Sequence, residues 1–179
     1  MEYPTIFHLV AGIADNLGIK FVLIGGFAVG QYGYPRQTFD ANFLTTRENF
    51  DKISKQLQNA GFELGDIRDN CARLKGPDHY LSMDIDFLFV DKNTLDKILA
   101  DSKEVMISNQ KLLVPSINML IALKLHAIKN NPKLRERKDL LDIISIIRAN
   151  KVDYKSNEFR ELCLKYVTED IYNKIANEV

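Results

Sequence analysis

Apolar residues near the start of the chain recur with the period of a helix. They are separated by three or four positions: Ile6, Leu9, Val10, Ile13 and Leu17. Pro4 precedes them, where a first helical turn tolerates proline, and Gly18 follows, where a helix commonly ends. We therefore predict a helix that packs by one face and ends at Gly18.

The next apolar run is too short for a helix. Residues 21–24 are all apolar and lead directly into the pair Gly25 and Gly26. A short run of this kind is typical of a strand buried on both sides. We expect a strand that enters a glycine turn, followed by a short helix over 27–34.

Two later segments alternate between polar and apolar positions, over 38–45 and 79–90. Side chains two residues apart on a strand point to the same face, so each segment predicts a strand with one polar face. The apolar alternates, such as Phe43 and Ile85, indicate that the other face lies against a core. The polar positions that share a face within each strand are Asp40 with Asn42, and Asp84 with Asp86.

The remaining segments predict a sheet-bearing half followed by a helical half. Thr45–Glu48 resembles a capping box before a helix that ends near Gly61, and the pattern over 62–75 is weak. Further helices are predicted over 95–100, 116–128, 139–149 and 158–177, the last as one or two helices, and strands over 71–74 and 105–114. The fold class is α+β: a mixed, twisted sheet flanked by helices, then a C-terminal helical bundle. We place the boundary near Pro115, giving 1–115 and 116–179, and expect them to pack as one compact unit.

Composition narrows the functional classes. With 46% hydrophobic and 27% charged residues, the 179-residue chain is an ordinary globular protein. Lys plus Arg equals Asp plus Glu, 24 each, so binding to nucleic acid would require a local basic patch. Cys71 and Cys163 have no partner at zinc-ligand or disulfide-framework spacing. No basic and apolar leader and no long apolar window is present, so we expect a cytoplasmic protein with no membrane segment.

The glycine pair and the acidic strands suggest phosphate and cation chemistry. Gly25 and Gly26 allow backbone amides to approach a phosphate, although for a glycine pair taken alone a tight packing turn is the favoured explanation. Carboxylates on one face of a sheet repel each other unless a cation or an arginine lies among them. Oxygen ligands two residues apart on a strand suit magnesium. The alternative without a ligand is that these polar side chains belong to a solvated edge strand.

In combination, these segments resemble a known superfamily. Leu23–Gly26, then thirteen residues, then Asp40–Phe43, and later Ile85–Phe87, resemble the nucleotidyltransferases of the polymerase-β type. Arg36-x-Thr38-x-Asp40, together with the helical segments 120–125 and 137–142, is similar to the minimal and AbiEii-like branches. AbiEii-like proteins are toxins of type IV toxin–antitoxin systems. The resemblance covers residues 20 to 146.

The resemblance implies transfer of an NMP from an NTP to an acceptor hydroxyl, with pyrophosphate leaving and Mg²⁺ or Mn²⁺ as cofactor. The residues so implied in nucleotide binding are Gly25, Gly26, Arg36, Thr38, Lys124, Lys138 and Asp139. Asp40 would be a metal ligand, and Asp86 would activate the acceptor hydroxyl. The acceptor is an RNA, a protein or a small molecule, and an antitoxin is a possible partner.

One position departs from the family pattern. The second metal ligand is normally Asp or Glu, whereas here it is Asn42, whose amide offers one neutral oxygen. Asp84 can restore the missing charge, which makes Asp40, Asp84 and Asp86 the catalytic trio and adds Asn42 as the fourth metal ligand. The alternative is a nucleotide- or partner-binding relative without catalysis.

Several charged residues have two readings. Arg36 can neutralise a phosphate or pair with a carboxylate, and Lys124 can reach the triphosphate or extend harmlessly from an apolar helix. Asp142 is explained by the start of a helix, where acidic residues interact favourably with the helix dipole. The basic residues near position 135 can bind an RNA acceptor or form a solvated connection, and we slightly favour the latter.

Overall fold

The computed structural model of the chain describes residues 3–78 and 83–179; the first four residues of the predicted strand over 79–90 lie outside the described residues. The chain divides into two compact units. They are the residues up to Ala28 together with Gln37–Pro115, and Val29–Arg36 together with Ser116–Val179. The short segment before Gln37 therefore belongs with the helical unit, although the hydrophobic pattern placed it in the sheet-bearing half.

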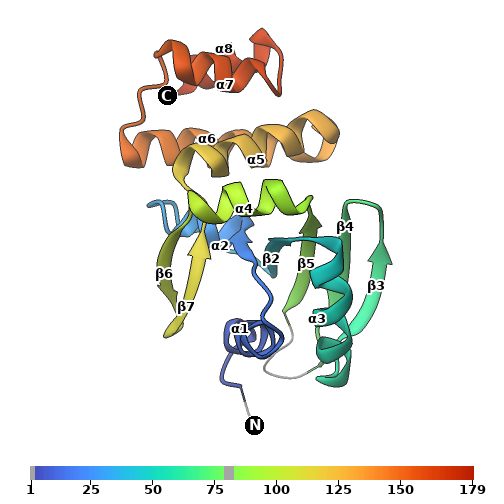
Figure 1. The fold of residues 1–179 in the computed structure, drawn as a ribbon. Helices are drawn as coiled ribbons and strands as arrows, with labels where there is room; N and C mark the ends of the chain where they lie inside the picture. Colours follow the sequence, from blue (N-terminus) through green and yellow to red (C-terminus); the bar gives the residue numbers. More distant parts are fainter. Residues whose placement is uncertain (1–2, 79–82) are drawn as a thin grey trace. The chain divides into compact units, whose positions relative to one another are not determined.

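The first unit contains a five-stranded mixed sheet in the order β1-β2-β5-β4-β3, with β3 at an edge, and a separate two-stranded hairpin of β6 and β7 (Figure 1). The strands are β1 Val22–Ile24, β2 Asp40–Thr45, β3 Glu63–Ile67, β4 Cys71–Lys75, β5 Asp84–Phe89, β6 Lys103–Ile107 and β7 Gln110–Val114. β2 and β5 run parallel, and the other neighbouring strands are antiparallel. The predicted α+β class with a mixed sheet is confirmed.

The apolar face of β2 and β5 forms the core of this unit. The helices are α1 Ile6–Leu17, α2 Gly25–Gly30, whose last two residues belong to the second unit, α3 Arg47–Asn59 and α4 Lys92–Ala100. Phe43 of β2 and Phe87 of β5 are buried with ring centroids 5.7 Å apart. Phe50 of α3 lies 5.3 Å from the Phe87 ring, so α3 covers this face. The residues that alternate with these phenylalanines consequently point to the opposite face of the sheet.

The second unit is formed mainly by helices, together with the segment Val29–Arg36. Its helices are α5 Ile117–Asn130, α6 Pro132–Asn150, α7 Asn157–Leu164 and α8 Glu169–Glu178. Ser116 caps α5 as predicted, because its hydroxyl accepts a hydrogen bond from the Met119 N–H. α5 packs on α6 and α7, and α8 packs on α6 and α7. Among the residues that the structure describes, no helix is both long and apolar enough to cross a membrane.

One strand was missed, and two local predictions are wrong. Strand β3 was not predicted, because all five of its residues are exposed at the sheet edge and no burial-driven alternation marks it. The N-cap of α3 is Thr46, which accepts from the Asn49 N–H, while Thr45 is buried in β2 and donates to the Lys20 carbonyl. Helix α6 begins at Pro132, so residues near 139 lie in its middle rather than in its first turn.

Candidate active site

Four polar side chains predicted as metal ligands come together on one face of the sheet. In the parallel pair β2 and β5, Asp40 is the register partner of Asp84, and Asn42 is the register partner of Asp86. Neighbouring strands are about 4.8 Å apart, so the four side chains form one small group. Each is half-buried, and the side chains of Asp40 and Asp86 are 28% and 27% exposed. The group is therefore accessible to a ligand from solvent.

Gly25 lies directly against this group. Its φ of +69° falls in the left-handed region that favours glycine, and a Cβ there would lie 3.0 Å from three side-chain atoms of Asn42. The contact arises because Ile24, the last residue of β1, is the register partner of Asn42. Gly26 follows in α2. The glycine pair is thus positioned at the end of β1 beside the polar face, and only glycine satisfies both the conformation and the contact at position 25.

The structure adds a residue that sequence reasoning missed, Arg73 of β4. Its Nε and Nη2 atoms donate to the two carboxylate oxygens of Asp86 at 2.7 and 2.8 Å, and Nη2 also lies 4.0 Å from Oδ2 of Asp40. The pKa of the Arg73 guanidinium is raised by its hydrogen bonds and charge interaction with Asp86, and further by the charges of Asp84 and Asp40. A strand was predicted at this place, but its pairing register with β5 is not readable from local pattern.

Two further hydrogen bonds hold the carboxylates. Thr38, predicted in nucleotide binding, donates its hydroxyl to Oδ1 of Asp40 at 2.9 Å. The backbone N–H of Gly76 donates to Oδ1 of Asp84 at 3.0 Å. Oδ1 of Asp40 and Oδ1 of Asp84 accept from neutral donors, whereas Asp86 is bound by the full positive charge of Arg73, which also lies near Oδ2 of Asp40.

The donor set fits one divalent cation better than two. Asp40, Asp84 and the amide oxygen of Asn42 are hard oxygen donors of the kind that Mg²⁺ and Mn²⁺ prefer. Both oxygens of Asp86 already accept from Arg73. Across residues 3–78 and 83–179, no three His, Cys, Asp or Glu side chains are arranged as a ready metal site. The residues that would hold a cation here are Asp40, Asp84 and Asn42, because both oxygens of Asp86 are bound by the Arg73 guanidinium.

The other predicted phosphate ligands form a different cluster, within the helical unit. The Lys124 ammonium donates to Asp139 at 2.9 Å and to Asp142 at 2.6 Å. Arg36 donates from Nε and Nη2 to the two oxygens of Asp142 at 2.7 and 2.9 Å. The side chains of Lys124, Asp139 and Asp142 are at most 7% exposed. Arg36 and Lys124 thus bind carboxylates in this structure, while Lys138 is exposed on α6.

The structure shows that the explanation of Asp142 as a residue at the start of a helix is wrong. It lies in the middle of α6, so the helix dipole at an N-terminus does not explain it. Burial alone would raise its pKa, but the hydrogen bond from Arg36 and the charge of Lys124 outweigh burial and lower the pKa below its ordinary value. Asp139 keeps Oδ2 buried without a hydrogen-bond partner. Two positive and two negative groups make this cluster neutral.

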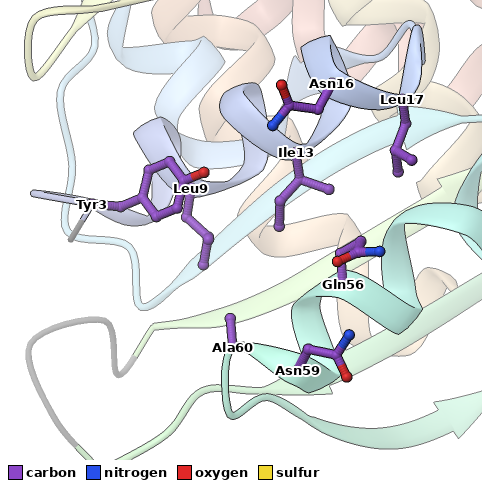
Figure 2. Close-up of a pocket in the computed structure, with 8 residues that line it drawn as sticks. All are labelled: Tyr3, Leu9, Ile13, Asn16, Leu17, Gln56, Asn59 and Ala60. Atoms are coloured by element: carbon purple, nitrogen blue, oxygen red, sulfur yellow. The ribbon is translucent and has the colours of Figure 1, made fainter. Parts of the chain in front are cut away.

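A separate groove of about 380 Å³ lies between α1 and α3. Figure 2 shows its lining, with apolar side chains such as Leu9 and Ile13 from α1, and the amides of Gln56 and Asn59 from α3. None of the residues predicted to bind nucleotide or metal lines it. Since α3 covers the apolar face of the sheet, the groove does not belong to the carboxylate group.

Comparisons with known proteins identify the fold. No protein-family model matches the sequence, and no curated protein matches it. Among solved structures, the antibiotic-resistance factor ANT(2'')-Ia is similar with a TM-score of 0.64 and 13% identity, over 95% of this chain and 92% of that one. An antigenic nucleotidyltransferase-like protein from Paracoccidioides brasiliensis follows at TM-score 0.55 and 18% identity, covering 94% and 92%.

The lincomycin-bound lincosamide adenylyltransferase LnuA has a TM-score of 0.53 and 14% identity, over 76% of this chain and 91% of that one. At such low identity these likenesses concern the fold. The chain has the nucleotidyltransferase fold, the fold that the resemblance of the glycine pair and the acidic strands predicted.

Proposed function

We propose that the chain transfers an NMP from an NTP to an acceptor hydroxyl. The observation that carries the proposal is the group of Asp40, Asn42, Asp84 and Asp86 on one face of two parallel strands, with Gly25 packed against it. Arg73 neutralises one of the three carboxylate charges, and the divalent cation that accompanies a triphosphate would balance the other two. The nucleotidyltransferase fold supports the same activity.

In the proposed reaction, the acceptor oxygen bonds to the α-phosphorus, the bond from that phosphorus to the β-phosphate bridging oxygen breaks, and pyrophosphate leaves. Asp86 takes the proton of the acceptor hydroxyl; each of its oxygens retains lone-pair capacity beside the bonds from Arg73. Asp40 and Asp84, with the oxygen of Asn42, would hold Mg²⁺ or Mn²⁺. Such a cation neutralises phosphate charge and orients the reacting oxygens.

For the acceptor we propose a small hydroxylated molecule as the first class to test. One similar structure is described as an antibiotic-resistance factor that binds adenylyl-2''-tobramycin, and another as a lincosamide adenylyltransferase bound to lincomycin. An RNA or protein acceptor, and an antitoxin partner as in the AbiEii-like branch, remain predictions from the sequence resemblance. ATP is the donor to try first, because those two relatives carry adenylyl chemistry in their descriptions.

A second candidate function is nucleotide binding without catalysis. Two observations favour it: the neutral Asn42 at a position where the family carries a carboxylate, and the guanidinium of Arg73 bound to both oxygens of Asp86. A site with weakened metal binding can still hold a nucleotide through the glycine turn. Turnover therefore separates the two candidates, and binding does not.

The test is incubation of the purified chain with each α-³²P-labelled NTP, Mg²⁺ or Mn²⁺, and pools of aminoglycosides, lincosamides, tRNA and proteins. We expect a labelled product together with released pyrophosphate. Asp40→Asn should lower the rate at least about 100-fold, because a metal ligand contributes several kcal/mol to such a reaction. Asp66→Asn, an exposed carboxylate on β3, is the matched control and should retain the rate. Saturable NTP binding without product in any pool would favour the second candidate.

A further inference from the structure

One side of helix α6 is accessible to solvent along most of its length. Residues three, four or seven positions apart lie on the same side of a helix. The buried residues of α6, such as Ile143 and Ile147, lie on one side. The opposite side, which we call the exposed α6 face, consists of Leu134, Arg137, Lys138, Leu141, Ser145 and Arg148.

Two leucines give the exposed α6 face an apolar line. Leu134 is 75% exposed and Leu141 is 52% exposed. They are seven residues apart, so they lie about two turns, or about 10 Å, from each other along the helix. A single exposed leucine is ordinary on a protein surface. Two leucines aligned on one side of a helix form a ridge against which a second helix can pack.

Positive charge lies between the two leucines. Arg137 and Lys138 are on the same face and are exposed, and neither makes an ion pair with any residue in 3–78 or 83–179. The acidic neighbour Glu136 is paired with Lys174 of α8. Because the whole chain carries no net charge, this excess of cations is local, and it attracts a negatively charged partner.

The combination of leucines with cations favours a protein partner over the other anionic partners. Surfaces that bind single-stranded RNA combine cations with aromatic side chains on which bases stack, and none of the six residues of the face is aromatic. A helix that lies in a membrane surface inserts its apolar side into lipid, whereas the apolar side of α6 is buried. A helix of another protein can cover the leucines and place carboxylates beside the cations.

We propose that the exposed α6 face is the docking surface for an acidic amphipathic helix of a partner protein. Apolar residues of that helix cover Leu134 and Leu141, and Asp or Glu residues flanking them pair with Arg137 and Lys138. The proposal goes beyond the transfer reaction and does not depend on it, since no residue of the face belongs to the carboxylate group on the sheet.

The experiment measures binding of a fluorescent helical peptide to the full-length chain by anisotropy. The peptide has about 20 residues, with leucines two turns apart and glutamates beside them. Wild type should bind it at least about tenfold more tightly than a version with lysine in place of glutamate. Leu134→Ser combined with Leu141→Ser should weaken binding at least about tenfold, because the apolar contact is lost.

The charged part of the face has its own variant. Arg137→Gln should weaken binding of the acidic peptide about threefold to tenfold and make it less sensitive to salt, because one cation is removed. Two substitutions elsewhere are matched controls and should bind as wild type does. They are Leu64→Ser, an exposed leucine on β3, and Arg68→Gln, an exposed arginine.

Three results would overturn the proposal. They are no binding of the acidic peptide by wild type, equal binding by wild type and the leucine double variant, and tighter binding of single-stranded RNA or phosphatidylserine vesicles than of the peptide. An unchanged urea midpoint shows that a variant is folded. The leucine double variant should transfer nucleotide at the wild-type rate, so the proposed function stands or fails independently of the docking surface.

Discussion

Two charged clusters in this chain use the same chemistry to different ends. In the helical unit, Arg36 donates two hydrogen bonds to the carboxylate of Asp142, and on the sheet Arg73 donates two to the carboxylate of Asp86. The first cluster is neutral, and its ammonium and both carboxylates are almost completely buried. The second has an excess of two negative charges and is open to solvent, since the Arg73 side chain is 50% exposed.

The difference separates a structural role from a binding role. Buried charges need partners of opposite charge, and each charge of the Lys124 cluster has one within the cluster, although Oδ2 of Asp139 accepts no hydrogen bond. The carboxylates around Asp40 do not reach neutrality with Arg73 alone, and they are tolerated because water still reaches them. A partly neutralised, accessible cluster is therefore where a cationic ligand can gain binding energy, whereas a balanced buried cluster holds helices together.

The largest effect should come from removing the cation of the buried cluster. Lys124→Met leaves two buried carboxylates, Asp139 and Asp142, with Arg36 as the remaining positive charge of the cluster, and Arg36 is paired with Asp142. We therefore expect a loss of about 3–5 kcal/mol in the free energy of unfolding, measured by urea denaturation. Lys174→Met, which breaks the exposed pair with Glu136, should cost at most about 1 kcal/mol. Equal losses in the two variants would erase the distinction between the clusters.

On the sheet, the expected pattern is the reverse. Asp40→Asn should lower transferase activity at least about 100-fold. Its free energy of unfolding should change by less than about 1 kcal/mol, or rise at low salt, because one charge is removed from a solvent-accessible cluster whose net charge is negative. Steady-state rates and urea denaturation of the same preparation measure both. A large loss of stability would mean that Asp40 is structural, like Asp142.

A smaller effect concerns the turn beside the sheet cluster. Gly25→Ala should destabilise the chain by about 1–3 kcal/mol, through its φ of +69° and the 3.0 Å approach to Asn42. Gly18→Ala is the matched control, since Gly18 has a φ of +63° but nothing within 4 Å of a Cβ, so it carries only the conformational part. Chemical denaturation of both variants isolates the contact with Asn42, and identical losses would show that the contact is without consequence.

The mildest test lowers the pH and compares wild type with Asp142→Asn. The folded-state pKa of Asp142 is held below its ordinary value, so its carboxylate contributes stability that is fully present above the unfolded-state pKa of about 3.9. That contribution is lost as the pH falls through the lower folded-state pKa. The difference in urea midpoint between the two proteins should be constant from pH 7 to about 5 and should shrink below about 4. A difference that does not shrink between pH 4 and pH 2.5 would place the stabilisation elsewhere.

Local pattern predicted much of the fold. The period of three to four residues identified α1, and the period of two put Asp40 with Asn42 and Asp84 with Asp86, because these periods are properties of single elements. The AbiEii-like assignment and the nucleotide-binding roles of Lys138 and Asp139 stay predictions. Strand β3 was not predicted from the sequence, because an exposed edge strand needs no alternation of apolar residues.

The sequence by itself determined which side chains share a face of each strand and where the glycine turn lies. Only the tertiary structure decided that β5 pairs with β2 in parallel and with β4 in antiparallel register, which brings Arg73 onto Asp86. It also decided that Lys124 and Arg36 meet Asp142, 18 and 106 residues along the chain from it. The reason is physical: secondary structure follows from neighbours along the chain, whereas the partner of a charge depends on strand order and helix packing, which local periodicity does not encode.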